Sequence, residues 1–221
     1  MVLPRGLLAQ LDTLLREELG DPATVAALVR NLGEDVLSWR APEIAPERTT
    51  TILAFTFGNR MQPNGNRTPG AVNEALADLT ARLHAETNAP VFAQWEIAEA
   101  VGGRVPQDKL TAIFPARDAR AEPLYLSTSG VVEAVIGRVG DPALLGTVGI
   151  VAFADHAWRC VATARRFGLL DAAMPAGYTM PDQYDPLSGQ PWCRSRLAYL
   201  LHDIAIRITE RRDAAISAQA N

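Results

Sequence analysis

Three side chains suited to acid–base or anion chemistry stand where an apolar segment gives way to a helical pattern. The stretch TVGIVAFADHAWRCVATARRFG, residues 147–168, has Asp155, His156 and Arg159 at this junction. His156 and Arg159 are three residues apart and share one helix face, and the first turn of a helix favours an anion. We predict that Arg159 holds a phosphate or carboxylate, that His156 exchanges a proton near neutral pH, and that Asp155 orients His156.

A simpler interpretation of the same junction stays open. Asp155 is a good helix N-cap residue, or it pairs with Arg159 one turn further on. A histidine at the start of a helix is often only a polar surface residue. The spacing by itself does not choose between a binding site and ordinary helix capping.

Polar residues also follow the other predicted strands. In open parallel sheets, ligands bind beyond the C-terminal ends of the strands. Besides those after residue 154, the residues expected there are Gly58, Asn59 and Arg60 after the first strand, Gln94, Trp95 and Glu96 after the second, and Ser127, Thr128 and Ser129 at a helix start. We expect them to converge on one crevice, with Arg60 and Arg159 holding the anion and N–H groups after Gly58 and Ser127 assisting. The Ser127–Ser129 segment is more typical of a helix cap than of a nucleophile.

The elements that position these residues alternate between strand and helix. Apolar or β-branched segments predict strands within 49–58, 89–95, 109–118 and 147–154. Amphipathic segments follow each of them, and the last is a long helix after residue 190. Two further helices precede the first strand, and the second begins at Asp21-Pro22, a capping pattern repeated at Asp141-Pro142. The fold prediction is an α/β domain over residues 46–221, a Rossmann-like parallel sheet of about five strands with helices on both faces, preceded by an N-terminal helical extension over residues 1–45.

Two details of this prediction concern packing. Leu197, Leu200, Leu201, Ile204 and Ile208 are expected to form the inner face of the last helix. A further short strand is expected near AAMPAGY, residues 172–178.

The order of elements and several motifs resemble one bacterial family. FGNRMQPNGNRTPG follows the first predicted strand with Gly58, Asn59, Gly65 and Pro69 in place, His156 and Arg159 form His-x-x-Arg, and QPWCRSRLAYLLHDIAIR forms an aromatic, Arg-containing closing helix. In these features, over roughly residues 48–208, the chain resembles the YdcF/SanA/ElyC-like family of Rossmann-like proteins. The resemblance implies a Rossmann-like fold and an anionic or nucleotide-like ligand. AQWEIAEA and STSGVVE replace the family's usual segments at the corresponding positions.

Cofactor motifs are sparse. G-x-G-x-x-G does not follow the first strand and no Walker motif occurs, which argues against ordinary NAD or P-loop nucleotide binding. S-adenosylmethionine or another nucleotide-like ligand bound by another route stays a candidate. A metal held by Glu96, Glu99, Glu133 and His156 is an alternative with less support.

Composition sets further limits. The chain of 221 residues has a net charge of −4, which argues against a general nucleic-acid binder. A run of 18 apolar residues is absent and the N-terminus lacks the apolar core of a signal peptide, so we expect no membrane span and a cytoplasmic location. The functional hypothesis is an enzyme for phosphoester hydrolysis or group transfer on a small anionic ligand. The alternatives are a non-catalytic ligand-binding protein of the same fold, and an interaction protein that forms a homodimer through its Leu-rich N-terminal helices.

Overall fold

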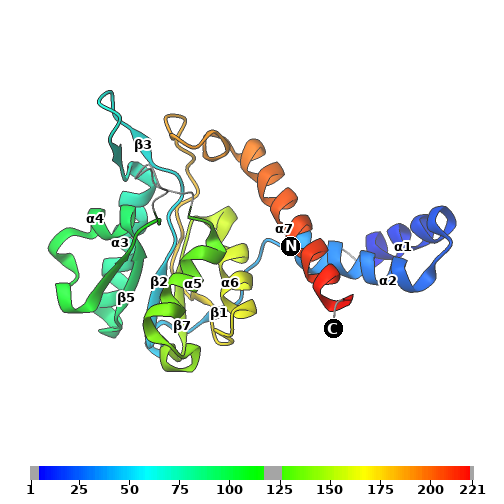
Figure 1. Ribbon diagram of the computed structural model, residues 1–221, viewed down its shortest axis with the longest axis horizontal. Coiled ribbons are helices and arrows are strands. Elements are labelled where there is room, and N and C mark those ends of the chain that lie inside the picture. The colour runs from blue at the N-terminus through cyan, green and yellow to red at the C-terminus, as the bar shows by residue number, and fades with distance from the viewer. Residues whose placement is uncertain (1–4, 117–125, 220–221) are drawn as a thin grey trace. The chain divides into compact units, whose positions relative to one another are not determined.

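The computed structural model describes residues 5–116 and 126–219 (Figure 1). The chain forms two compact units, one of Met1–Arg40 with Tyr199–Asn221 and the other of Ala41–Ala198. We call them the helical unit and the sheet unit. The last residues, which the sequence assigns to the sheet domain, thus group with the N-terminal helices.

The helical unit begins with the two expected helices. They are α1 (Arg5–Leu19) and α2 (Pro22–Asn31), and a π-helical turn, Leu32–Val36, continues α2. The Asp21 carboxylate accepts hydrogen bonds from the N–H groups of Ala23 and Thr24, both at 3.1 Å. The capping prediction is confirmed, and Asp141 caps the short 3-10 helix Pro142–Leu145 in the same way.

Helix α7 (Arg196–Gln219) closes the helical unit with a polar buried face. Arg207 and Asp203 form an ion pair of 2.6 Å, and both side chains are at most 1% exposed. The Arg207 guanidinium also donates to main-chain carbonyls, among them that of Ser38, and lies 4.2 Å from the centre of the Trp39 ring. These contacts surround the buried charge with an opposite charge and carbonyl oxygens, which offsets part of the cost of its burial.

The predicted inner face of this helix is therefore wrong for three of its five residues, while Leu200 and Ile204 are partly buried. Leu197 and Leu201 are 71% and 61% exposed, and Ile208 is exposed as well. The buried positions are Tyr199, Asp203 and Arg207, spaced four residues apart. The hydrophobic pattern misleads here because carbonyls and a carboxylate compensate the charge of Arg207, which lets a charged stripe replace an apolar one.

The sheet unit contains the expected parallel sheet. Its strands are β2 (Thr51–Ala54), β5 (Val91–Gln94), β6 (Leu110–Ile113) and β7 (Val148–Val151), in the order β6-β5-β2-β7. All neighbours in this order pair in parallel. In the described part of the chain the sheet has four strands rather than about five. The expected extra strand is β8 (Met174–Pro175), which pairs with β1 (Glu43–Ile44), and the preceding residue, Ala173, also forms a parallel bridge with Gly149 of β7. Residues 117 and 118 of the third predicted strand lie outside the described residues.

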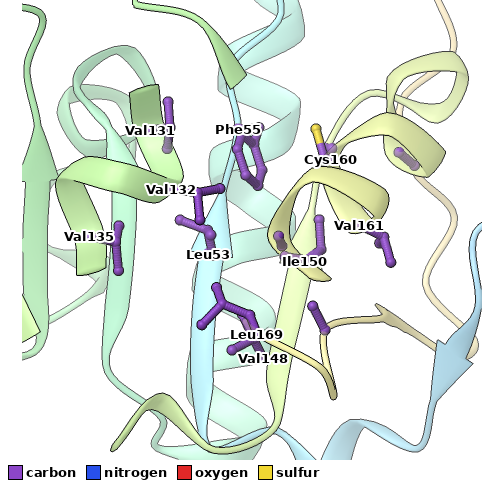
Figure 2. Packing of buried hydrophobic residues seen from close by; sticks show 14 of the residues in the cluster. Leu53, Phe55, Val131, Val132, Val135, Val148, Ile150, Cys160, Val161 and Leu169 are labelled. Carbon is purple, nitrogen blue, oxygen red and sulfur yellow. The ribbon is translucent and has the colours of Figure 1, made fainter. Parts of the chain in front are cut away.

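Helices flank this sheet. They are α3 (Ala71–Thr87), α4 (Trp95–Val101), α5 (Thr128–Val139) and α6 (Ala157–Arg166), with α3 packed against α4 and α5 against α6. Leu53, Val148 and Ile150 point toward α5 and α6 and pack with Val132 and Val161 (Figure 2). Gly149, the residue between Val148 and Ile150, instead lies close to Leu83 of α3. Because strand side chains alternate between faces, the two helix pairs cover opposite faces of the sheet.

The remaining elements are short. β3 (Arg60–Met61) and β4 (Arg67–Thr68) form an antiparallel hairpin after β2. Single 3-10 turns occur at Pro46–Arg48, Gly102–Arg104, Gln107–Lys109, Ala154–His156 and Pro191–Cys193. None of the helices in the described ranges combines the length and the apolarity needed to cross a bilayer.

Candidate functional site

The segment after β2 is held by a buried asparagine of α3. Asn73 is fully buried; its Oδ1 accepts a hydrogen bond from the N–H of Phe57 at 2.9 Å, and its Nδ2 donates to the carbonyls of Gly58 and Pro69, each at 2.7 Å. Gly58 has φ +72°, and a Cβ there would lie 2.4 Å from Ser188 Oγ. Only glycine fits this turn, both by conformation and by space.

Glu96 lies buried beyond the end of β5. It is 5% exposed, and its Oε1 accepts a hydrogen bond from Asn59 Nδ2 at 3.3 Å. Its Oε2 is buried and has no hydrogen-bond partner among the residues that the structure describes. Burial raises the pKa of Glu96 to about 7, although its hydrogen-bonding surroundings, which include Asn59 and Thr56, and the charge of Arg67 favour the ionised form. The structure therefore brings two predicted site residues, Asn59 and Glu96, into contact.

The end of β7 meets the end of β2 through aromatic rings. Phe57 and Phe153 stack with ring centres 3.9 Å apart. His156 is buried, and its ring centre lies 6.4 Å from that of Phe55 and 6.3 Å from that of Phe57. His156 occupies the N-cap position of α6 without a side-chain capping bond. The alternative in which Asp155 caps this helix is therefore wrong.

The Asp155 carboxylate binds a segment that the sequence did not connect with it. It accepts hydrogen bonds from the hydroxyl of Tyr184 at 2.8 Å and from Arg196 Nε and Nη2 at 2.9 and 3.1 Å. Desolvation and the bond to Asp155 raise the pKa of the Tyr184 hydroxyl. Asp155 thus anchors a neighbouring segment, and its predicted role of orienting His156 stays a prediction.

Residues at the starts of α5 and α6 contact each other. Arg159 is 5% exposed and its Nη1 donates to Thr128 Oγ1 at 3.0 Å. Ser127 Oγ accepts from the N–H of Gly130, which confirms that Ser127 caps this helix. Ser129 Oγ accepts from Arg166. Two predicted site residues, Thr128 of α5 and Arg159 of α6, are therefore joined by a side-chain hydrogen bond.

Arg60 forms a two-pronged ion pair with Asp185. Arg60 Nε and Nη2 donate to the two oxygens of this carboxylate at 2.8 and 3.1 Å. This pair lowers the pKa of Asp185. The charge of Arg60 is thus already matched by a neighbouring carboxylate.

Residues 181–196, which we call the strap, supply these unexpected partners. The strap contacts the segment after β2 through the N–H of Gly189, which donates to the Asn59 carbonyl at 2.6 Å, and the loop after β7 through the Pro181 carbonyl, which accepts from Ala154 at 2.9 Å. Figure 1 shows it as the yellow-to-orange stretch near β3. The motif YDPLSGQPWCRSR contains the residues that contact Asn59, Arg60 and Asp155. From its composition alone it predicts only the start of the last helix and the segment before it, and not these contacts.

The alternative metal set is not assembled in the part of the chain that the structure covers. Among the described residues, no three His, Cys, Asp or Glu side chains gather closely enough to hold an ion. Glu99 and Glu133 are both exposed, unlike Glu96 and His156.

Comparison of the chain with protein-family models, curated proteins and solved structures finds no match. Function is consequently inferred from the geometry described above.

Proposed function

We propose that the C-terminal edge of the sheet binds a small anionic or nucleotide-like ligand and that Glu96 and His156 perform acid–base chemistry on it. The observation that carries the proposal is Glu96, a buried carboxyl with one unpartnered oxygen and a pKa of about 7 at the end of a central strand. A group with a pKa near the working pH transfers protons most effectively. Such perturbed groups gather at functional sites more often than elsewhere.

The strand order supports the part of this edge on which His156 lies, after β7. The chain runs from β2 outward to β5 and β6 and then returns to β7 on the other side of β2. A Rossmann-like sheet, which remains part of this proposal, would have such an order, and ligands bind where the order reverses. The reversal falls between β2 and β7, whose following residues, Phe57 and Phe153, stack on each other.

Within this proposal, several of the predicted residues have a role in binding or proton transfer. Arg159, held by Thr128, contributes positive charge, and the N–H groups beyond Gly58 and Ser127 contribute donors. Asn59 orients Glu96 through their hydrogen bond. The reaction class is phosphoester hydrolysis or group transfer, with S-adenosylmethionine among the nucleotide-like candidates. The resemblance to the YdcF/SanA/ElyC-like family is part of this proposal and agrees with such a ligand.

A turnover assay tests the proposal. Wild type and three variants, Glu96→Gln, His156→Ala and Arg138→Gln, are incubated with p-nitrophenyl phosphate, nucleotides and S-adenosylmethionine, and products are followed by mass spectrometry. We expect Glu96→Gln and His156→Ala to lose about 100-fold or more in turnover. Arg138 is exposed near the end of α5, so its variant should keep full turnover.

The other outcomes are equally informative. A ligand that binds wild type but is not consumed would favour the non-catalytic binding protein. Unchanged turnover in both Glu96→Gln and His156→Ala would refute the assigned chemistry. If wild type consumes none of these ligands and none of them stabilises the protein, the proposed site itself is refuted.

A further inference from the structure

The hairpin that follows β2 carries two arginines in different situations. Arg60 and Thr68 are cross-strand partners, as are Met61 and Arg67. Arg60 is bound to Asp185 through both oxygens of the carboxylate. The Arg67 guanidinium is exposed and has no hydrogen bond or ion pair with any residue in the described ranges. The two cations at this edge are therefore not equivalent.

The hairpin's own contacts show which way each side chain points. Gln62 Nε2 donates to Thr68 Oγ1 at 3.1 Å, so the side chains of Gln62 and Thr68 share one face of the hairpin. Arg60 lies opposite Thr68 and belongs to that face as well, since directly paired residues point the same way. Met61 and Arg67 consequently lie on the other face.

We place Glu96 of α4 on the side toward which this second face of the hairpin points. Asn59 precedes Arg60 and contacts Glu96, whereas Arg60 contacts Asp185, so the two neighbouring side chains point to opposite sides. Alternation along the chain then gives Met61 the direction of Asn59, and Arg67 follows its partner Met61. The positive charge of Arg67 lowers the pKa of Glu96, which agrees with this placement.

We infer that Arg67, rather than Arg60, is the arginine that binds the anionic group of the ligand beside Glu96. A guanidinium with its donors available binds a phosphate-like oxyanion through two parallel hydrogen bonds. Arg60 would first have to give up both bonds to Asp185. This inference rests on the proposed function and narrows it to a ligand whose oxyanion lies next to the proton-transferring carboxyl.

Sulfate is the probe for this inference because, unlike phosphate, it does not titrate near neutral pH. Its dissociation constant is measured by amide NMR shifts for wild type and for Arg67→Gln, Arg67→Lys, Arg60→Gln and the matched charge control Arg138→Gln. We expect Arg67→Gln to weaken binding about tenfold or more, the loss of a charge-assisted hydrogen bond. Arg67→Lys should recover part of the affinity, and Arg60→Gln and Arg138→Gln should change it less than about threefold.

The titration of Glu96, followed by carboxyl carbon NMR, is the second readout. The positive charge of Arg67 stabilises the ionised form of Glu96, so removing it in Arg67→Gln should raise the pKa of Glu96. Arg60→Gln should leave this pKa unchanged. Sulfate should also raise this pKa in wild type but not in Arg67→Gln, since coupling between two binding events is reciprocal. If Arg67 only lay near Glu96 and bound no anion, the second effect, the response of this pKa to sulfate, would be the same in Arg67→Gln as in wild type.

The failures are distinguishable. If wild type binds sulfate and Arg67→Gln binds it equally well, or if Arg60→Gln causes the larger loss, the inference about Arg67 is overturned while the proposed function stands. If wild type does not bind sulfate, the anionic ligand of the proposed function and the inference fall together. An unchanged pKa of Glu96 in Arg67→Gln would also overturn the inference, because Arg67 would then not lie beside Glu96.

Discussion

Replacing Glu96 by glutamine should change how the stability of the protein depends on pH. Burial raises the pKa of Glu96 from 4.5 to about 7. Between these values the folded protein keeps a proton that the unfolded chain releases, so the free energy of unfolding falls as the pH rises through this range. Below the lower value both states are protonated, and above the upper value both are ionised, so the contribution is constant there. The amide of the Glu96→Gln variant does not titrate in this range, so the substitution removes this component.

The size of the effect follows from the shift. A difference of 2.5 pKa units between 4.5 and 7 corresponds to about 3 kcal/mol at full separation. At about pH 8, Glu96→Gln should therefore be more stable relative to wild type than it is at about pH 4, by up to this amount. The side chain is only 5% exposed, so solvent screening removes little of it.

Urea denaturation followed by tryptophan fluorescence measures this difference across the pH range. Glu99→Gln is the matched control, because Glu99 lies on the same helix with an exposed side chain and should show no such trend. The groups common to wild type and variant cancel in the difference, which isolates Glu96. A difference between wild type and Glu96→Gln that stays flat with pH would refute the raised pKa, and with it the argument for acid–base chemistry at this residue.

Two further changes test the supports of the two units. Gly58→Ala should destabilise the sheet unit by about 1–3 kcal/mol, because it adds a Cβ at φ +72° and 2.4 Å from Ser188 Oγ; thermal unfolding measures this, and a stability equal to wild type would contradict the tight turn. Arg207→Met should cost about 3–5 kcal/mol because it leaves Asp203 buried without its charge partner. Urea unfolding followed by circular dichroism measures that cost, which the double variant with Asp203→Leu should largely restore.

Local chemistry made much of the fold predictable from the sequence. The Asp21-Pro22 and Asp141-Pro142 pairs predict helix starts because a carboxylate satisfies free N–H groups at a position where proline loses nothing. The buried strands stand out as short apolar or β-branched segments, and their alternation with helices predicts a parallel sheet. These signals depend on neighbours in the chain and do not require knowledge of distant contacts.

Contacts between distant segments explain what could not be predicted. The buried face of α7 carries Asp203 and Arg207 because carbonyls near Ser38 accept from Arg207. A pattern of apolar spacing gives no weight to such an arrangement. The same holds for the ion pair between Arg60 and Asp185, which are separated by 125 positions.

The strap changes which predicted residues are suited to bind a ligand. It supplies Asp185 to Arg60 and Arg196 to Asp155, so one predicted cation and one predicted anion each have an opposite charge bound to them. Glu96 has no such charge partner at salt-bridge distance among the described residues, and one of its oxygens has no hydrogen bond there. A ligand that binds at Arg60 or Asp155 must replace an existing ion pair, whereas one that binds beside Glu96 gains a hydrogen bond where none exists. The energetics therefore favour the side of the edge formed by the ends of β2 and β5, although the Asp-His-Arg spacing after β7 is the stronger signal in the sequence.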